Sequence, residues 1–324
     1  MSEPVIGIDV SKATLDITIM RFDKLRHHQV ANSVEGWRAL IKWLRQQKIA
    51  RGHACLEATG RFSLGVAIAL HDAGHVVSLI NPAQIKDFSR SKLGRNKTDK
   101  VDSATIYDYG ATFDPPAWSP PSPALRRLCE LRTMRDGFMT SRVEWQNRAG
   151  SGVADPTATE LANATIAHLK QQIEAVDQAI RETIDGDDEL REKRDLLLTI
   201  DGVGETLAAI ILAELPGRDV ISTGAQAVAY AGLNPSHFKS GSSINRPTRI
   251  SKIGNATLRA ALFMPAMVAM RYNEAVAALA ARLRAKGKLK SKQIVVAAMR
   301  KLLVICFGVL RSRMPFDAKI AMAE

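Results

Sequence analysis

Two short apolar segments near the start of the chain each end in a carboxylate, and this pattern constrains the fold more than any other feature. Residues 5–10, VIGIDV, have the character of a buried β-strand that ends beside Asp9. Residues 53–57, HACLE, repeat the pattern and end on Glu57. Further strands are expected at 15–20, 27–30 and 75–80, with helices at 37–44 and 60–72. Strands that alternate with helices predict an α/β sheet with parallel elements.

Helical spacing dominates the rest of the chain. Five prolines between residues 115 and 123 mark a linker. Long helices are expected at 124–148 and 157–184, and the second combines regularly spaced apolar residues with many acids, as in a coiled-coil arm. We therefore expect an α/β domain at 1–120, a coiled-coil arm of long helices at 121–195, and an all-α domain at 196–324.

The charge of the chain is large and unevenly distributed. The 45 basic and 33 acidic residues give a formal net charge of +12. Between Lys239 and Arg313 there are sixteen basic residues and one acid, Glu274. Solvated charged surfaces usually mix both signs, so this run predicts binding to a nucleic acid. Residues 151–200 hold eleven acids and five bases, and we expect this acidic stretch to contact protein.

A second pair of carboxylates lies in the segment NKTDKVDS, residues 96–103. Asp99 and Asp102 are three residues apart and share one face if the segment is helical. Four acids brought together repel one another unless divalent cations compensate them, and oxygen ligands favour Mg²⁺ or Mn²⁺. Two such ions would stabilise the attacking and leaving oxygens of phosphodiester transfer. The bases that would hold a phosphate backbone against this centre are Lys92, Arg95, Lys97 and Lys100.

The first strand also permits a different interpretation. GIDVS, residues 7–11, resembles the phosphate-binding strand of sugar kinases and actin-like ATPases. That interpretation predicts a second glycine-rich hairpin and an adenosine motif later in the chain, and neither is evident.

Two glycine-containing segments in the second half are candidate nucleic-acid contacts. Residues 198–208, LTIDGVGETLA, fit a helix-hairpin-helix whose Gly202 and Gly204 allow close approach of a phosphate; a turn between two core helices is the alternative. Residues 231–243, AGLNPSHFKSGSS, are expected to form a serine-glycine loop. One interpretation is that a serine hydroxyl in this loop attacks phosphorus as a nucleophile. The alternative is a polar, flexible loop without a catalytic role. His237 is a minor candidate for a base. The basic residues around this loop are Lys239, Arg246, Arg249, Lys252 and Arg259.

Taken in order, GIDVSK, LEATG, NKTDKVDS, GVGETLA, AYAGLNP, KSGSS and ISKIGNATLRAALF resemble the DEDD transposases of bacterial insertion sequences over nearly the whole chain. The resemblance implies an N-terminal RuvC-like (RNase H-fold) domain, a coiled-coil connection and a helical transposase domain. It further implies a metal-binding tetrad of Asp9, Glu57, Asp99 and Asp102, with Ser240 as nucleophile. Ser242 and Ser243 are close enough to take the place of Ser240.

The same resemblance implies partners that the residues alone do not predict. In such recombinases the serine becomes covalently joined to DNA, and a structured bridge RNA pairs with donor and target DNA. Homo-oligomers, dimers or tetramers, assemble composite sites from the tetrad of one subunit and the serine of another. We therefore expect a DNA transposase that uses Mg²⁺ or Mn²⁺.

Two alternatives remain open. The first is a nuclease of the Holliday-junction resolvase kind, which would use the tetrad and water without a covalent step. The second is a nucleic-acid-binding protein without catalytic activity.

The cysteine pattern and the hydropathy of the chain also predict the cell compartment in which the protein acts. The three cysteines, Cys55, Cys129 and Cys306, are widely separated and suggest neither a disulfide framework nor a zinc site, as expected in a reducing cytoplasm near the nucleoid. We expect no signal peptide, and no membrane span at 294–310, because two basic residues interrupt that apolar stretch.

Overall fold

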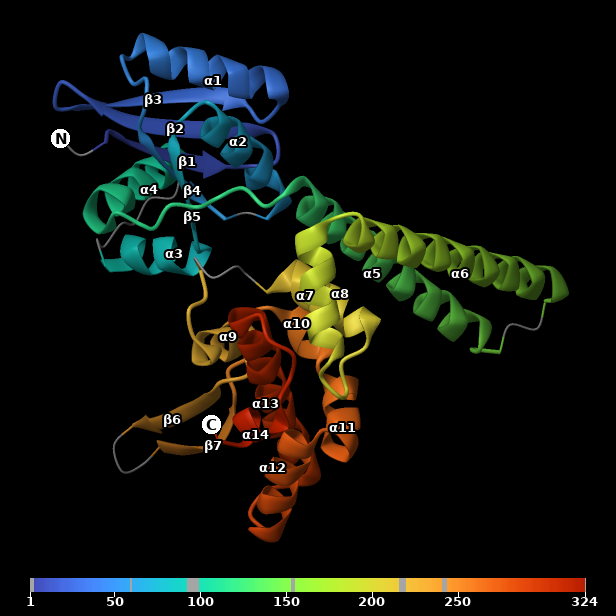
Figure 1. Cartoon of the computed structure of the whole chain (residues 1–324). Coiled ribbons are helices and arrows are strands. Elements are labelled where there is room, and N and C mark those ends of the chain that lie inside the picture. Colours follow the sequence, from blue (N-terminus) through green and yellow to red (C-terminus); the bar gives the residue numbers. More distant parts are fainter. Residues whose placement is uncertain are drawn as a thin grey trace. The chain divides into compact units, whose positions relative to one another are not determined.

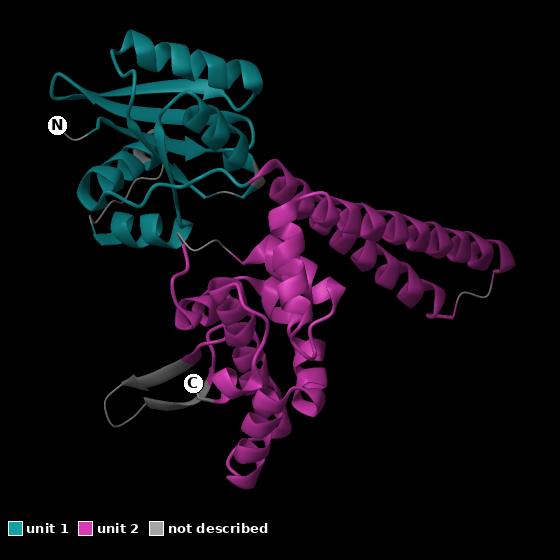
Figure 2. Ribbon diagram, in the orientation of Figure 1, with its two compact units in different colours: residues 1–121 teal, residues 122–324 magenta. Residues whose placement is uncertain are grey.

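The computed structural model describes residues 3–58, 60–91, 99–152, 155–215, 220–240 and 244–323. The side chains of residues 61, 99–101, 236–240, 244–248 and 323 lie outside that description. The chain divides into two compact units, residues 1–121 and 122–324 (Figure 2). The helices expected to form a separate arm belong to the second unit, and a further division near residue 195 stays a prediction.

A five-stranded mixed sheet forms the centre of the first unit. Its strands are β1 (Val5–Val10), β2 (Thr14–Arg21), β3 (Lys24–Ala31), β4 (His53–Glu57) and β5 (Val76–Ile80), in the order β3-β2-β1-β4-β5. The first three strands form an antiparallel meander, whereas β4 and β5 run parallel to β1. The expected α/β sheet with parallel elements is confirmed.

The two faces of this sheet differ in chemistry. One face is apolar: Ile6, Ile8 and Leu15 are fully buried beneath α1 (Val34–Gln46) and α2 (Arg61–Asp72). The other face has small and polar residues and is covered by α4 (Asp99–Phe113), against which α3 (Pro82–Ser91) packs (Figure 1). The predicted carboxylates belong to this second face.

The proline-rich segment after α4 is attached to β5 by hydrogen bonds. The Ser78 hydroxyl lies 3.0 Å from the carbonyl oxygen of Pro115 and 2.8 Å from that of Pro116. The backbone N–H of Trp118 donates to the carbonyl of Val77 at 2.6 Å. The predicted linker is therefore ordered along the sheet over these residues.

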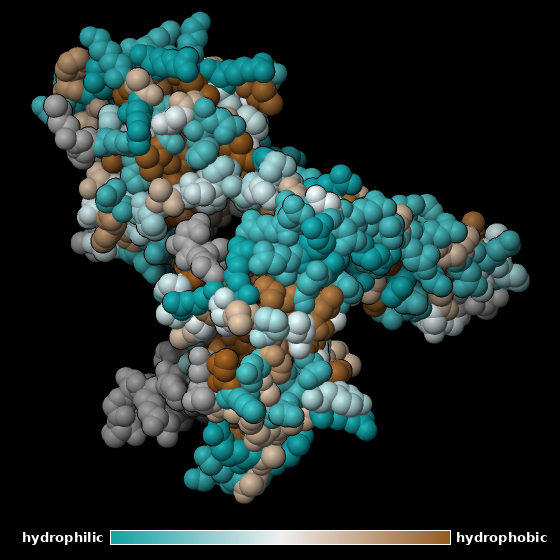
Figure 3. Space-filling model, viewed as in Figure 1, coloured by the Kyte–Doolittle hydropathy of each residue, from teal (hydrophilic) through white to brown (hydrophobic). Residues whose placement is uncertain are grey.

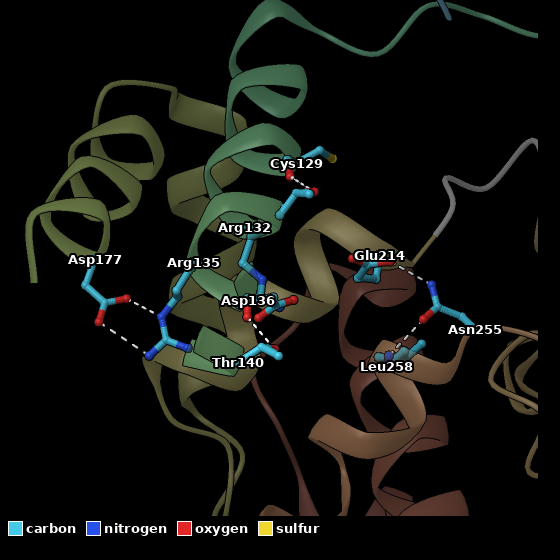
Figure 4. Close-up of polar contacts among 10 residues, drawn as sticks. Cys129, Arg132, Arg135, Asp136, Thr140, Asp177, Glu214, Asn255 and Leu258 are labelled. Carbon is cyan, nitrogen blue, oxygen red and sulfur yellow. Dashed lines mark hydrogen bonds and ion pairs between the residues drawn. The ribbon is translucent and has the colours of Figure 1, made fainter. Parts of the chain in front are cut away.

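Two long helices, α5 (Pro123–Ala149) and α6 (Pro156–Asp185), pack against each other as an antiparallel pair. Each begins with a capping side chain followed by proline, Ser122 before α5 and Asp155 before α6. The Arg135 guanidinium pairs with the Asp177 carboxylate across the two helices (Figure 4). Their visible surface is mostly hydrophilic (Figure 3). Whether this pair has coiled-coil packing stays a prediction.

The remaining helices surround one apolar core. Its central element is α13 (Ser291–Ser312), which is long and apolar enough to cross a membrane by length and composition alone. Half of its apolar stretch is buried inside the unit, and Leu302, Leu303 and Cys306 are fully buried, so it has the burial of a core helix. The other helices are α7 (Asp188–Leu198), α8 (Glu205–Glu214), α9 (Gly224–Tyr230), α10 (Ala256–Ala261), α11 (Phe263–Tyr272), α12 (Glu274–Ala285) and α14 (Ala318–Ala323).

The expectation that residues 196–324 are entirely helical is wrong. Strands β6 (Pro235–Ser240) and β7 (Ile244–Ile250) pair as an antiparallel hairpin where a serine-glycine loop was expected. The segments contain few apolar residues and two prolines, so they lack the alternation that predicts a strand. Both strands are edges of a two-stranded sheet, where proline is tolerated.

Candidate active site

The two carboxylates predicted at strand ends lie at the same edge of the sheet. Asp9 is the penultimate residue of β1, and Glu57 is the last residue of β4. Ile8 pairs with Leu56 in the parallel ladder, so the next residues along the two strands, Asp9 and Glu57, are neighbours. Both side chains are half-buried. The structure therefore brings together two members of the predicted tetrad.

Helix α4 lies directly on the strand that carries Asp9. A Cβ atom built on Gly7 would fall closer to the backbone of Ser103 and Tyr107 than real Cβ atoms come to any neighbour. The Ser103 hydroxyl also hydrogen bonds to the hydroxyl of Thr18 on β2, at 2.8 Å in a buried setting. Glycine at position 7 is thus required for this close helix–strand contact.

The direction of α4 places its first turn beside the carboxylates. Gly110, near the end of the helix, lies against Val5 at the start of β1, whereas Ser103 lies against Gly7 further along the strand. The helix therefore runs opposite to β1, and its N-terminal turn, containing Asp99 and Asp102, points to the edge where β1 and β4 end. The Asp102 side chain is half-buried. Asp99 begins the helix, and its side chain lies outside the described part.

The donor set at this edge consists of carboxylates. Among the residues whose side chains the structure describes, no three histidine, cysteine, aspartate or glutamate side chains form a group that could hold a metal ion. The described members, Asp9, Glu57 and Asp102, supply hard oxygen ligands, so the chemistry of the donor set fits Mg²⁺ or Mn²⁺. Asp99 is the remaining predicted ligand.

A further acid, which sequence reasoning missed, lies on the same face. Asp16 on β2 stands directly opposite Asp9 in the antiparallel register, and it is only 3% exposed. Its carboxylate accepts hydrogen bonds from the side-chain amide of Gln29, at 3.1 Å, and lies 3.0 Å from His27 Nε2. In the sequence, Asp16 alternates with apolar residues, which is typical of a solvent-facing side chain. The face is instead covered by α4, a helix that lies more than eighty residues away in the chain.

The side chains of the four basic residues predicted beside the tetrad lie outside the described part of the chain. Lys92, Arg95 and Lys97 lie outside the described residues, and Lys100 belongs to α4 but its side chain is not described. Their role as phosphate contacts stays a prediction.

The segment predicted as a helix-hairpin-helix contains the end of α7, a short turn and the start of α8, and the motif itself stays a prediction. Gly202 has a φ of +97° and packs against Ala269 of α11, so it has a structural reason to be glycine. Gly204 precedes α8 without a side-chain cap, and no atom lies within 4 Å of a Cβ built on it. Of the two glycines, Gly204 is the one with room for a ligand.

The predicted nucleophile occupies the end of a strand. Ser240 is the last residue of β6 and pairs with Ile244; its side chain lies outside the described part, as do those of Lys239 and Arg246. Arg249 and Lys252 are exposed. Arg259 donates from Nη1 to the carbonyl of Ala231 at 2.9 Å, which gives it a structural contact at the base of the hairpin.

That base is built by two of the motifs on which the resemblance depends. Gly232, in AYAGLNP, has a φ of +67°, and a Cβ there would lie 2.6 Å from Arg259 Nη1. Gly254, in ISKIGNATLRAALF, has a φ of +127°, and a Cβ there would lie 2.2 Å from the carbonyl oxygen of Tyr230, which is too close for any other residue. The two segments on either side of the hairpin are therefore packed backbone to backbone.

Asn255 connects this base to the helical core (Figure 4). Its Nδ2 donates to Glu214 Oε2 at 2.7 Å, and its Oδ1 accepts from the backbone N–H of Leu258, which caps α10. Burial raises the pKa of the neighbouring Tyr230. The β6–β7 hairpin, whose first strand ends at Ser240, therefore starts from segments that these hydrogen bonds and the close contacts at Gly232 and Gly254 hold together, and we call those segments its platform.

Comparisons with known proteins identify families and relatives that this chain matches. Residues 6–154 match a family model described as a transposase of the IS110 DEDD type, and residues 194–281 match the transposase IS116/IS110/IS902 family. The pilin gene-inverting proteins of Moraxella bovis and Moraxella lacunata are each 32% identical over 99% of both chains. A protein of insertion element IS110 from Streptomyces coelicolor is 29% identical over 53% of this chain and 42% of its own.

Among solved structures, RuvC from T. thermophilus in complex with a Holliday junction substrate aligns with 35% of this chain and 94% of its own, at 17% identity and a TM-score of 0.28.

Proposed function

This chain belongs to the IS110 family of transposases, and from that membership we propose that it cuts and rejoins DNA with its carboxylate edge and Ser240. The enzyme class follows from the family: it is a transposase, a DNA-cleaving and rejoining enzyme. Its named relatives invert a pilin gene, and we infer a related exchange of strands between two DNA sites here.

The observation that carries the proposal is the convergence of Asp9, Glu57 and the first turn of α4 at one edge of the sheet. Asp9, Glu57, Asp99 and Asp102 would hold one or two divalent cations. When bound, such ions stabilise the charge on the oxygens that attack and leave phosphorus. The ends of β1 and β4 would supply Asp9 and Glu57, and the first turn of α4 would supply Asp99 and Asp102.

In the proposed reaction the Ser240 Oγ attacks a DNA phosphorus atom. The Oγ–P bond forms, the bond from phosphorus to one bridging deoxyribose oxygen breaks, and that oxygen leaves as a hydroxyl after taking up a proton. A hydroxyl of a second strand then attacks the phosphoserine, which restores the serine and joins the strands. Each step exchanges one phosphodiester for another, so no external energy source is needed.

The hairpin supports the choice of Ser240. Ser240 is the last residue of β6, and the segments from which the hairpin starts are held together at Gly232, Gly254 and Asn255. Flanking bases such as Arg249 and Lys252 are exposed and available to a phosphate backbone. Ser242 and Ser243 are the competing nucleophiles, since they follow Ser240 within three residues of the sequence.

We further propose that a structured RNA selects the two DNA sites and that subunits combine to assemble the active site. Both ideas come from the resemblance to the DEDD transposases. A protein of this kind would act in the cytoplasm, at the nucleoid. The experiment is to purify the full chain from cells that carry its element, sequence the bound RNA, and ask whether that RNA directs joining of two DNAs in the presence of Mg²⁺. Joining without RNA would contradict the RNA-guided part alone.

A resolvase-like nuclease is the second candidate, supported by the carboxylate edge but not requiring the serine hairpin. It would hydrolyse DNA with water and leave no protein–DNA adduct, so adduct formation separates the two mechanisms.

A further inference from the structure

The buried acid Asp16 has no part in the proposed reaction, yet it lies on the face that carries the tetrad. We propose that Asp16 is a positioning residue for this site: it fixes the neighbouring Asp9 and increases the negative charge that attracts a divalent cation. The inference rests on the proposed function, because it concerns the metal affinity of the same carboxylate edge.

The register of the sheet sets the distance between the two acids. Asp9 and Asp16 are directly paired residues of β1 and β2, and such side chains share a face with Cβ atoms about 5 Å apart. Gln29 of β3 pairs with Asp16, so a row of three polar side chains crosses the meander. At 3% exposure, Asp16 is more deeply buried than the half-buried Asp9.

Two donors hold the Asp16 carboxylate in one orientation. Gln29 Nε2 lies 3.1 Å from both carboxylate oxygens, and His27 Nε2 lies 3.0 Å from Oδ1. Both donors come from β3, on the side of Asp16 away from β1. The Asp16 carboxylate is therefore held by hydrogen bonds on its β3 side, while Asp9 lies on its β1 side.

Strand β2, which carries Asp16, also contacts α4, the helix that contains Asp99 and Asp102. Thr18, two residues after Asp16 and on the same face, hydrogen bonds to Ser103, and Ser103 follows Asp102 directly in α4. β2 thus contacts both the strand of Asp9 and the helix of Asp102. Such a layer of buried polar contacts is the kind of support that holds metal ligands in position.

Buried like charges at adjacent positions disfavour the fold unless something offsets them. Gln29 and His27 contact the Asp16 carboxylate only from the β3 side, away from Asp9. A divalent cation held by Asp9 offsets both charges, which gives a reason for a second acid.

The test uses the full chain and the isosteric change Asp16→Asn. Mn²⁺ affinity is measured directly, by electron paramagnetic resonance of the free ion, and Mg²⁺ by the rise in melting temperature that it causes. We expect Mn²⁺ to bind about tenfold more weakly, because one negative charge is lost beside the carboxylates that would hold the ion in a partly screened site. We also expect strand cleavage to recover at higher Mg²⁺, which a purely structural defect would not show.

The matched control is Asp23→Asn, the same change on an exposed turn of the same hairpin, at the end of β2 away from Asp9. It should leave Mn²⁺ affinity unchanged. Wild-type affinity in a folded Asp16→Asn variant would overturn the inference. If that variant does not fold, Gln29→Met, which removes one of the two donors to the carboxylate and keeps its charge, should weaken Mn²⁺ binding several-fold, and unchanged binding would refute the positioning role. Failure of the wild-type chain to bind Mn²⁺ would instead refute the metal site of the proposed function.

Discussion

Gly7 of β1 and Ser103 of α4 are in backbone contact, with no room for a side chain between them. This contact sets the height of α4 above the sheet, and therefore the position of Asp99 and Asp102 relative to Asp9. A methyl group at position 7 would lift the helix from the strand.

We therefore expect Gly7→Ala to lower the free energy of unfolding by about 1–3 kcal/mol, since the backbone of α4 must move to accommodate it. The rate of strand cleavage by the folded variant should also fall, because Asp102 moves away from Asp9 when α4 is displaced. Thermal or urea unfolding and a cleavage assay measure the two effects. Gly137→Ala is the control: a Cβ at that helical position meets no atom within 4 Å, so α5 should be unaffected or stabilised.

The tetrad assignment predicts that Asp102→Ala abolishes cleavage while DNA binding remains. The half-buried Asp102 carboxylate would be a metal ligand, and its loss removes a contact made to the reacting centre. Cleavage of labelled DNA and a gel-shift assay are the measurements. Asp72→Asn, which changes an exposed acid at the last residue of α2, should retain full activity. Normal cleavage by Asp102→Ala with added Mg²⁺ would refute the assignment.

The platform of the serine hairpin gives a prediction about stability and activity together. Asn255→Ala removes both the cap of α10 and the hydrogen bond to Glu214, so we expect a loss of about 1–2 kcal/mol in unfolding free energy. DNA joining should fall as well, because the hairpin loses its orientation. Thr223→Ala, which removes the cap of α9 at a similar cost, should leave joining per folded molecule unchanged. Equal effects of the two variants on joining would contradict this role of Asn255.

Acid should destabilise the first unit through His75. This side chain is 4% exposed, and within the described part of the chain its Nδ1 has no hydrogen-bond partner. Burial, followed by the charge of Arg45, lowers the pKa of His75 from the ordinary value of 6.5. A lowered pKa in the folded state means that the associated stability is present above pH 6.5 and is lost as the pH falls through the folded pKa.

The measurement is the unfolding free energy from pH 8 to pH 5, for the wild-type chain and for His75→Leu. The variant should show a weaker decrease over the acidic part of the range. An identical pH dependence in both proteins would show that His75 does not cause the loss.

Much of the first unit could be predicted from the sequence, because apolar strands and an amphipathic helix have clear periodicity. The positions of Asp9 and Glu57 at strand ends followed from that pattern, and the structure brings them side by side. Asp16 could not be found in this way, since alternation does not reveal which face a distant helix will cover. The β6–β7 hairpin was missed because its strands lack a buried apolar face to produce alternation.

The roles of Ser240 and Asp99 are predictions of a different kind. The assignment of Ser240 as nucleophile came from the resemblance to a family, and that of Asp99 came from its spacing to Asp102 together with the resemblance. The side chains of both residues lie outside the described part of the chain. Chemistry at these positions therefore has to be tested by substitution.

The most direct test of the central claim is the trapping of a covalent protein–DNA adduct that survives denaturation. The full chain is incubated with its bound RNA, Mg²⁺ and labelled DNA, and the reaction is stopped in detergent. We predict an adduct with the wild-type chain whose DNA-linked peptide contains Ser240, and none with Ser240→Ala or Asp102→Ala. Cutting and rejoining by Ser240→Ala at the wild-type rate, with the adduct at Ser242 or Ser243 or without any adduct, would contradict the account.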